Sequence, residues 1–424
     1  MGGGGVIFSY APGRPIPEEE VSERLREALA EIGRAGERWL VIIPDDTRTL
    51  PMPAIYRSLV EELAPRVKEL AFLVALGTHP PLTDDRLDQH LGPAWRDHPE
   101  IKVFQHAWGD PAALARVGEI SQGEMEEISR GLLKVSVPIE INRLALEYDF
   151  LLIVNPVFPH EVVGFSGGHK YFFPGISGPE MVNVSHWLGA LITNPKVNGH
   201  KQTPVREMIE RAAARVPTPR LGLSLVLQGH DLVGFFLGEV VEAWEAAADL
   251  SARVNIRWVD RPYHTVISMA PAMYRELWTA GKCMYKLEPV VEDGGTLIIY
   301  APHIREISPT HGRWLLEVGY HVRDYFTAQW EKFRKYPWAV LAHSTHVKGI
   351  GTFRGGVERP RIEVVLATGI PEEICRKINL GFQDPASIRL EELQGRQEGV
   401  LVVPNAGEKL WRLSDGTIPD IDKL

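Results

Sequence analysis

The stretch RWLVIIPDDTR, residues 38–48, joins a buried strand to a group of charged and polar residues. Its apolar part, Trp39–Ile43, has the length and β-branched content of a strand that is buried on both faces. A segment with apolar residues at helical spacing, Pro53–Leu63, follows at once. The stretch therefore predicts a strand, a polar loop at its carboxyl end and a helix.

The same strand-like pattern recurs along the chain. The runs are RWLVIIPDD (38–46), ELAFLVALGTH (69–79), EIKVFQHA (100–107), YDFLLIVNP (148–156), TLIIYAP (296–302), WAVLAHS (338–344), RIEVVLATG (361–369) and GVLVVPNAG (399–407). Amphipathic stretches such as Glu18–Ile32 and Val205–Arg215 lie between them and predict helices. Alternation of this kind favours an α/β fold with mostly parallel sheets and helices on both faces.

The length of 424 residues is too great for one typical domain. A new strand and helix series begins after the hairpin-like stretch VLQGHDLVGFFLGE, residues 226–239. We expect an N-terminal cofactor-binding and catalytic α/β domain at 1–262 and a C-terminal α/β domain at 263–424. The active site is expected in a cleft between them.

Composition excludes several classes of function. Lys and Arg total 46 against 55 Asp and Glu, with no dense basic run, which argues against nucleic acid as a partner. No apolar stretch approaches the length of about 20 residues that a membrane helix needs. The two cysteines, Cys283 and Cys375, stand far apart and offer neither a disulfide framework nor a thiolate zinc site. With no secretion or lipidation signal at the start, we expect a cytoplasmic protein.

Polar residues follow several of the expected strands, where ligands gather in α/β proteins. Arg48 has the planar donors that bind a carboxylate or phosphate, and Asp45 is placed to orient it; a plain salt bridge in a loop is the alternative. Gly77 and Thr78 allow close approach of an anion to the backbone, although a simple turn explains them too. His106 is either a base or a hydrogen-bonded core histidine.

The densest group of chemically active residues runs from His160 to His186 in HEVVGFSGGHKYFFPGISGPEMVNVSHW. Its glycines permit close approach of a ligand to the backbone, but GFSGGHK does not match a phosphate-binding Walker loop. Lys170 stands among aromatic residues, where desolvation makes an amine nucleophilic, unless its stem merely covers them. His186 is a suitable ligand for nickel, copper, iron or zinc, yet one histidine does not define a site.

The spacing of these motifs resembles the lactate racemase family. DDTRxxP, GTH, a histidine after a strand, His-x9-Lys-x15-His and the loop GFSGGxKxxxPG all match. The resemblance implies a nickel-pincer nucleotide, attached to Lys170 and with His186 as nickel ligand. It also implies maturation by cofactor biosynthesis enzymes and a set of cofactor-binding residues, namely Gly77, Thr78, Gly164, Ser166, Gly167 and Gly168.

By the same resemblance, the protein inverts C2 of a 2-hydroxy acid through reversible hydride transfer, the hydride returning to either face of a 2-keto acid. His106 and His160 then act as general acid and base on opposite faces of the substrate. Arg48, supported by Asp45, holds the substrate carboxylate, and Lys282 adds a second cation.

Two departures from the family pattern bear on the substrate. Trp278 and Thr279 stand where the family has a Tyr-Gln pair, and His303 and His346 add hydrogen-bonding groups. A site with many such groups selects a hydroxylated ligand, so we expect a sugar acid and 2-epimerisation of the gluconate to mannonate kind.

Three alternatives stay open. The first is a racemase of a short 2-hydroxy acid such as lactate or malate. The second is a divalent-metal hydrolase or lyase, although the histidines that would be its ligands form no compact motif: His79, His106, His160 and His186. The third is a sugar-acid binding protein without catalysis.

Overall fold

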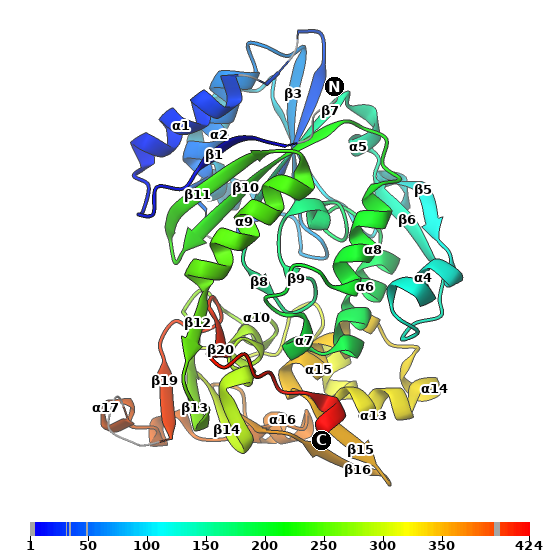
Figure 1. The fold of residues 1–424 in the computed structure, drawn as a ribbon, viewed down its shortest axis with the longest axis vertical. Helices are drawn as coiled ribbons and strands as arrows, with labels where there is room; N and C mark the ends of the chain where they lie inside the picture. The colour runs from blue at the N-terminus through cyan, green and yellow to red at the C-terminus, as the bar shows by residue number, and fades with distance from the viewer. Residues whose placement is uncertain (1–4, 31, 34, 48–49, 394–398) are drawn as a thin grey trace. The chain divides into compact units, whose positions relative to one another are not determined.

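The computed structural model describes residues 5–30, 32–33, 35–47, 50–393 and 399–424 (Figure 1). The chain divides into two compact units, each built from several segments. Unit 1 comprises Met1–Phe158, Phe165–Val182 and Pro204–Val254; unit 2 comprises Pro159–Gly164, Asn183–Thr203 and Asn255–Leu424. The expected domain boundary after residue 262 and the expected cleft between the domains stay predictions.

Unit 1 is built on a seven-stranded sheet of order β1-β11-β10-β7-β2-β3-β4. Its strands are β1 (Val6–Tyr10), β2 (Arg38–Pro44), β3 (Glu69–Ala75), β4 (Lys102–Gln105), β7 (Phe150–Pro156), β10 (Arg220–Gln228) and β11 (Asp231–Gly238). The five strands from β10 to β4 are parallel, whereas β11 pairs antiparallel with both β10 and β1. The expected hairpin at residues 226–239 is the β10–β11 pair.

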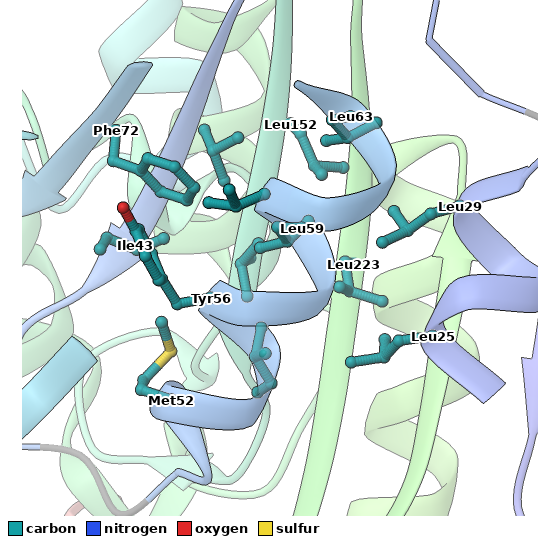
Figure 2. Packing of buried hydrophobic residues seen from close by; sticks show 14 of the residues in the cluster. Leu25, Leu29, Ile43, Met52, Tyr56, Leu59, Leu63, Phe72, Leu152 and Leu223 are labelled. Carbon is teal, nitrogen blue, oxygen red and sulfur yellow. The ribbon is translucent and has the colours of Figure 1, made fainter. Parts of the chain in front are cut away.

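The core of unit 1 lies between this sheet and two helices, α1 (Glu18–Ala30) and α2 (Met52–Leu63). Helix α1 begins with three glutamates, which favour the amino end of a helix through its dipole. Its buried Leu25 and Leu29 pack with Leu59 and Leu63 of α2 in one cluster (Figure 2). Truncating one such leucine to alanine costs about 2–5 kcal/mol.

Unit 2 holds a five-stranded, fully parallel sheet of order β18-β17-β14-β13-β19. Its strands are β13 (Tyr263–Met269), β14 (Val291–Ala301), β17 (Glu363–Thr368), β18 (Gly381–Phe382) and β19 (Val400–Val403). Two further pairs are parallel β12 (Ile256–Val259) with β20 (Leu410–Leu413) and antiparallel β15 (Gly351–Arg354) with β16 (Val357–Pro360). The expected α/β class with mostly parallel sheets is confirmed.

Seven of the eight expected strands are present, and the helices expected at 18–32, 53–63 and 205–215 appear as α1, α2 and α8 (Pro204–Ala213). The exception is WAVLAHS, which forms the helix α15 (Trp338–Lys348). All residues from 340 to 348 are buried. A helix that is covered on all sides has no polar face, so its apolar run shows no helical period and was wrongly interpreted as a strand.

The other helices connect these sheets. They are α3 (Asp84–Leu91), α4 (Gln122–Ile128), α5 (Leu144–Glu147), α6 (Pro179–Ile192), α7 (Asn194–Val197), α9 (Val240–Asn255), α10 (Leu277–Ala280), α11 (Lys282–Tyr285), α12 (Gly312–Val318), α13 (Arg323–Ala328), α14 (Trp330–Phe333), α16 (Glu372–Lys377) and α17 (Leu390–Leu393). The remaining strands are β5 (Leu114–Ile120), β6 (Val137–Asn142), β8 (Pro159–His160) and β9 (Gly164–Phe165). Among the described residues, no helix combines the length and apolar character that crossing a membrane requires.

Candidate active site

Asp45 and His79 meet at the carboxyl ends of β2 and β3, where Pro44 is in register with Ala75. The Asp45 carboxylate is 5% exposed; its Oδ2 lies 2.5 Å from Nδ1 of His79, and the Thr47 hydroxyl donates to its Oδ1 at 2.6 Å. The carboxylate thereby fixes the His79 ring, whose side chain is 45% exposed. Arg48, the expected carboxylate binder, lies outside the described residues.

The turn at Gly77 and Thr78 is tied to the loop that carries Lys170. Gly77 has a φ of +55°, and no heavy atom lies within 4 Å of the place where a Cβ would stand. Its N–H donates to the Gly175 carbonyl at 2.9 Å. The Gly77 amide is therefore used inside the protein, while the open side of this glycine leaves room for a ligand.

Asn155 anchors the glycine loop to the sheet. Its Oδ1 accepts the N–H of Gly168 at 3.0 Å and the hydroxyl of Ser224 at 3.2 Å. A Cβ on Gly167, whose φ is +85°, would lie 2.4 Å from this same oxygen. Gly167 is thus required by the close approach of the loop to the end of β7, whereas a Cβ on Gly168, whose φ is +60°, would lie 3.1 Å from the Trp244 ring.

The Ser166 hydroxyl also serves the loop itself. It donates to the Pro156 carbonyl at 2.9 Å and accepts the Phe158 N–H at 3.0 Å. Because both partners are main-chain groups of the neighbouring segment, the side chain fixes the loop. The predicted contact of Ser166 with a cofactor stays a prediction.

Buried charged side chains of α8 hold the loop in place, and sequence reasoning did not predict them. Arg206, 4% exposed, donates to the carbonyls of Phe165 at 2.6 Å and Gly167 at 3.1 Å, and burial lowers its pKa to about 10. Glu210 lies 2.5 Å from Nδ1 of His169 and 3.5 Å from Arg206. Burial alone would raise the pKa of the Glu210 carboxyl, but His169 and Arg206 lower it by a larger amount, so the pKa lies below its usual value. The only signal in the sequence was the i,i+4 spacing of Arg206 and Glu210.

Lys170 follows these glycines in a short turn of 3₁₀ helix, Gly168–Tyr171. Its carbonyl accepts the Gly175 N–H at 3.0 Å, which closes the loop. The neighbouring Phe172 and Phe173 are fully buried, whereas Lys170 is only partly buried. The aromatic neighbours therefore belong to the core, and the lysine keeps exposed surface.

His106 is 1% exposed and uses both ring nitrogens within unit 1. Asn142 donates from Nδ2 to Nδ1 at 3.1 Å, and Nε2 lies 3.0 Å from the Ser177 carbonyl, to which it donates. The Asn142 orientation is fixed because its Oδ1 accepts the Leu144 N–H at 3.1 Å. Burial lowers the pKa of His106 to about 4, so the ring is neutral at pH 7. To act as a base, His106 must first release one of these partners.

His160, in unit 2, has a different environment. The N–H of Val162 donates to its Nδ1 at 3.1 Å, which places the proton of the neutral ring on Nε2. The Glu161 carboxylate lies 3.4 Å from the same Nδ1. Burial raises the pKa of Glu161, but the neighbouring basic side chains hold it below its usual value; these are His160, His346 and Lys286. Glu161 thus adds negative charge beside His160, and sequence reasoning did not single it out.

Gly164 and His186 also lie in unit 2. A Cβ on Gly164, at a φ of +90°, would lie 1.8 Å from the His200 carbonyl, so packing alone requires this glycine. His186 stands on α6, partly buried, with its Nδ1 3.3 Å from the Ser185 hydroxyl. Within the described ranges, no three His, Cys, Asp or Glu side chains form a group able to hold a metal ion.

The expected substrate residues of unit 2 fall into two groups. Lys282 Nζ lies 5.2 Å from the centre of the Tyr274 ring, and His303 Nε2 is 3.0 Å from the Tyr274 carbonyl. Trp278 and Thr279 stand one turn before Lys282, and all three are partly buried. His346 differs, because it is only 5% exposed and burial lowers its pKa to about 4.

Trp278 is held in a stack of rings. It stacks on His343 at 3.9 Å between ring centres with an angle of 7°, and His311 lies 4.3 Å from it. His343 in turn has its Nε2 2.9 Å from the Trp278 carbonyl. The two histidine rings therefore hold the Trp278 indole in a fixed position, unlike a mobile surface side chain.

Comparison with known proteins finds relatives of this chain. Residues 10–198 match a family described as the lactate racemase N-terminal domain. The chain is 25% identical over 283 residues to lactate racemase of Lactiplantibacillus plantarum, a match that covers 65% of this chain and 62% of that enzyme. It is 24% identical over 338 residues to lactate racemase of Thermoanaerobacterium thermosaccharolyticum, covering 74% and 73%.

Solved structures agree. A crystal structure of a protein from Thermotoga maritima has a TM-score of 0.86 and 33% identity, covering 96% of this chain and 100% of that one. The lactate racemase apoprotein from Thermoanaerobacterium thermosaccharolyticum has a TM-score of 0.71 and 18% identity, covering 94% and 93%, which shows a shared fold. Residues 10–198 thus carry a lactate racemase N-terminal domain, and the chain has the fold of the lactate racemase apoprotein.

Proposed function

We propose that this protein is a racemase or epimerase that inverts C2 of a 2-hydroxy acid. The observation that carries the proposal is the Lys170 loop, in which Asn155 and the buried Arg206 hold two left-handed glycines that are separated from a partly exposed lysine by His169 alone. The comparisons supply the reaction class, since the curated relatives are named lactate racemase.

The residues present fit the nickel-pincer nucleotide that the family resemblance implies. Lys170 keeps exposed surface for attachment, His186 is a partly buried imidazole, and Gly77 has open space on its Cβ side. In this proposal Lys170 tethers the group and His186 is the nickel ligand. When bound, such a cofactor supplies a reversible hydride acceptor. Gly164, Ser166, Gly167 and Gly168 shape the loop, and in this proposal they also contact the cofactor.

The chain's own residues then manage the proton and the carboxylate. His160 exchanges the hydroxyl proton at Nε2, because its Nδ1 is occupied by the Val162 N–H. His106 serves the other face after releasing Asn142 or Ser177. Arg48 and Lys282 bind the substrate carboxylate, with Asp45 as the orienting group.

We propose a sugar acid as substrate, with a short acid such as lactate as the second candidate. Trp278, Thr279, Lys282 and His303 all retain exposed surface, and the last two contact Tyr274, so the four side chains are able to meet several hydroxyls. His346 is buried and is not needed in this role. The names of the curated relatives favour the second candidate.

The test uses protein produced together with the cofactor biosynthesis enzymes and verified to carry nickel. It is incubated with gluconate, mannonate, lactate or malate, and the epimers are separated by chiral chromatography. We expect turnover of the aldonates, its loss in His160→Gln and retained binding in that variant. A shift towards lactate in the double variant Trp278→Tyr, Thr279→Gln supports the assignment of these positions. Turnover of short acids alone contradicts the sugar-acid proposal, and binding without any turnover favours the binding-protein alternative.

A further inference from the structure

Unit 2 contains an open cavity of about 550 Å³ that no step of the proposed reaction uses. It lies beside Gly294 near the start of β14, Glu363 at the start of β17 and Gly381 of β18. Lys282 and His303 follow the carboxyl ends of β13 and β14 instead. Because the strands are parallel, the cavity lies at their amino ends, whereas those two residues follow the carboxyl ends.

We propose that this cavity binds a small organic anion, a metabolite with a phosphate or carboxylate group. Three cationic side chains line it, Lys348, Arg361 and Arg376, against a single carboxylate, that of Glu363. Pro360, Ile362 and Leu380 form apolar parts of its wall. The volume is within the range of about 300–1,000 Å³ that is typical of small-molecule sites.

Lys348 is the main reason to expect an anion. It ends α15, is 9% exposed and donates from Nζ to the Asn379 carbonyl at 2.6 Å. Across the described residues it forms no direct ion pair, although the carboxylates of Glu358 and Glu363 act on it from a greater distance, and burial lowers its pKa below the ordinary value. An ammonium group has three donors, and a buried charge without a counter-charge in direct contact is costly. An anion in the cavity supplies that counter-charge.

Arg361 and Arg376 complete the cationic side. Arg361 is 6% exposed and is fixed by the carbonyls of Val291 at 2.8 Å and Glu288 at 2.7 Å. Among the described residues its ion pair is with Asp293, whose side chain is 78% exposed and so neutralises it weakly, and the buried Glu288 carboxylate also acts on it. Arg376, on α16, is 64% exposed and pairs with Glu372 at 2.7 Å; because exposed ion pairs are weak, this one can give way to a ligand. The site thus combines two fixed cations with one adaptable cation at the rim.

The experiment is isothermal titration calorimetry of the full-length protein with inorganic phosphate, glycerol 3-phosphate and citrate as probes. We expect one-site binding of a probe with a dissociation constant below about 1 mM. Arg376→Glu should weaken it about tenfold or more, because a charged hydrogen bond is lost and a like charge is added. Lys377→Glu is the matched control, since Lys377 is the next residue of α16, is exposed and does not line the cavity.

Lys348→Met should abolish binding, and the exposed Arg376 keeps the test valid if that buried variant fails to fold. Preference for glycerol 3-phosphate or for citrate identifies a phosphate ester or a polycarboxylate as the ligand. No saturable binding of any probe, or binding that Arg376→Glu and Lys377→Glu change equally, overturns the proposal. The measurement needs no turnover, so its outcome is independent of the proposed reaction.

Discussion

The clearest single prediction concerns Asn142, which sets the protonation of His106. Asn142→Asp replaces the amide nitrogen that donates to Nδ1 with a carboxylate oxygen. The ring then has two acceptors, the new carboxylate at Nδ1 and the Ser177 carbonyl at Nε2. Because the imidazolium is the only form with two N–H groups, the substitution favours the charged ring.

The magnitude follows from the structure. Burial lowers the pKa of His106 from 6.5 to about 4, which corresponds to roughly 3 kcal/mol in favour of the neutral ring. A carboxylate at hydrogen-bond distance should raise the pKa by about one to three pH units. The variant ring should therefore titrate between about pH 5 and 7, where the wild-type ring stays neutral.

The assay is a pH titration of the protein labelled with ¹³C in the histidine rings, followed by NMR. His106→Gln assigns the signal, and Asn142→Leu is the matched control because it removes the donor without adding charge. In that control the pKa of His106 should stay low. A wild-type His106 that titrates near pH 6.5, or an Asn142→Asp variant that does not raise the pKa, would refute the reasoning.

Two further predictions concern stability. Gly167→Ala should lower the free energy of unfolding, measured in urea, by about 2–4 kcal/mol, since the new Cβ would lie 2.4 Å from Asn155 Oδ1 at a φ of +85°. The control Gly36→Ala has a φ of +90° but open space around the Cβ, so it should cost only about 1 kcal/mol. Equal losses in the two variants would contradict the prediction. Burial lowers the pKa of His343 to about 3, so the unfolded chain binds the proton first and stability falls as the pH drops below about 6.5. Between pH 7 and 5, His343→Gln should therefore lose about 2 kcal/mol less unfolding free energy than the wild type. His264→Gln, at an exposed histidine, should behave like the wild type, and identical pH profiles for all three proteins would refute this.

Local sequence patterns predicted the fold well where a short apolar run is bounded by polar residues, which is typical of a buried strand, or where a helix has one apolar face. Strands such as β2 and β7 are short, apolar and bounded by polar residues, and α2 has one apolar face. Helix α15 was misread because it is buried all round. Two domains were expected, but the assignment of the segments Pro159–Gly164 and Asn183–Thr203 to unit 2 was beyond sequence reasoning, since it rests on contacts that no local pattern reveals.

The site was predictable in its residue types but not in their partners. Asp45 was expected to orient Arg48, and in the structure its carboxylate lies 2.5 Å from Nδ1 of His79. The partners of His106, by contrast, come from Asn142 and Ser177, which are 36 and 71 residues away along the chain. Hydrogen bonds between distant segments follow from tertiary packing, so sequence could indicate the histidine but not that both its nitrogens are engaged.

The central claim is inversion at C2 by hydride transfer on this chain. The most direct measurement uses nickel-loaded protein with gluconate or lactate deuterated at C2, and mass spectrometry of the separated epimers. The account predicts an inverted product that keeps its deuterium, and loss of this product in Lys170→Ala. Inversion with loss of deuterium to water, or no inversion of any 2-hydroxy acid by nickel-loaded protein, would contradict it.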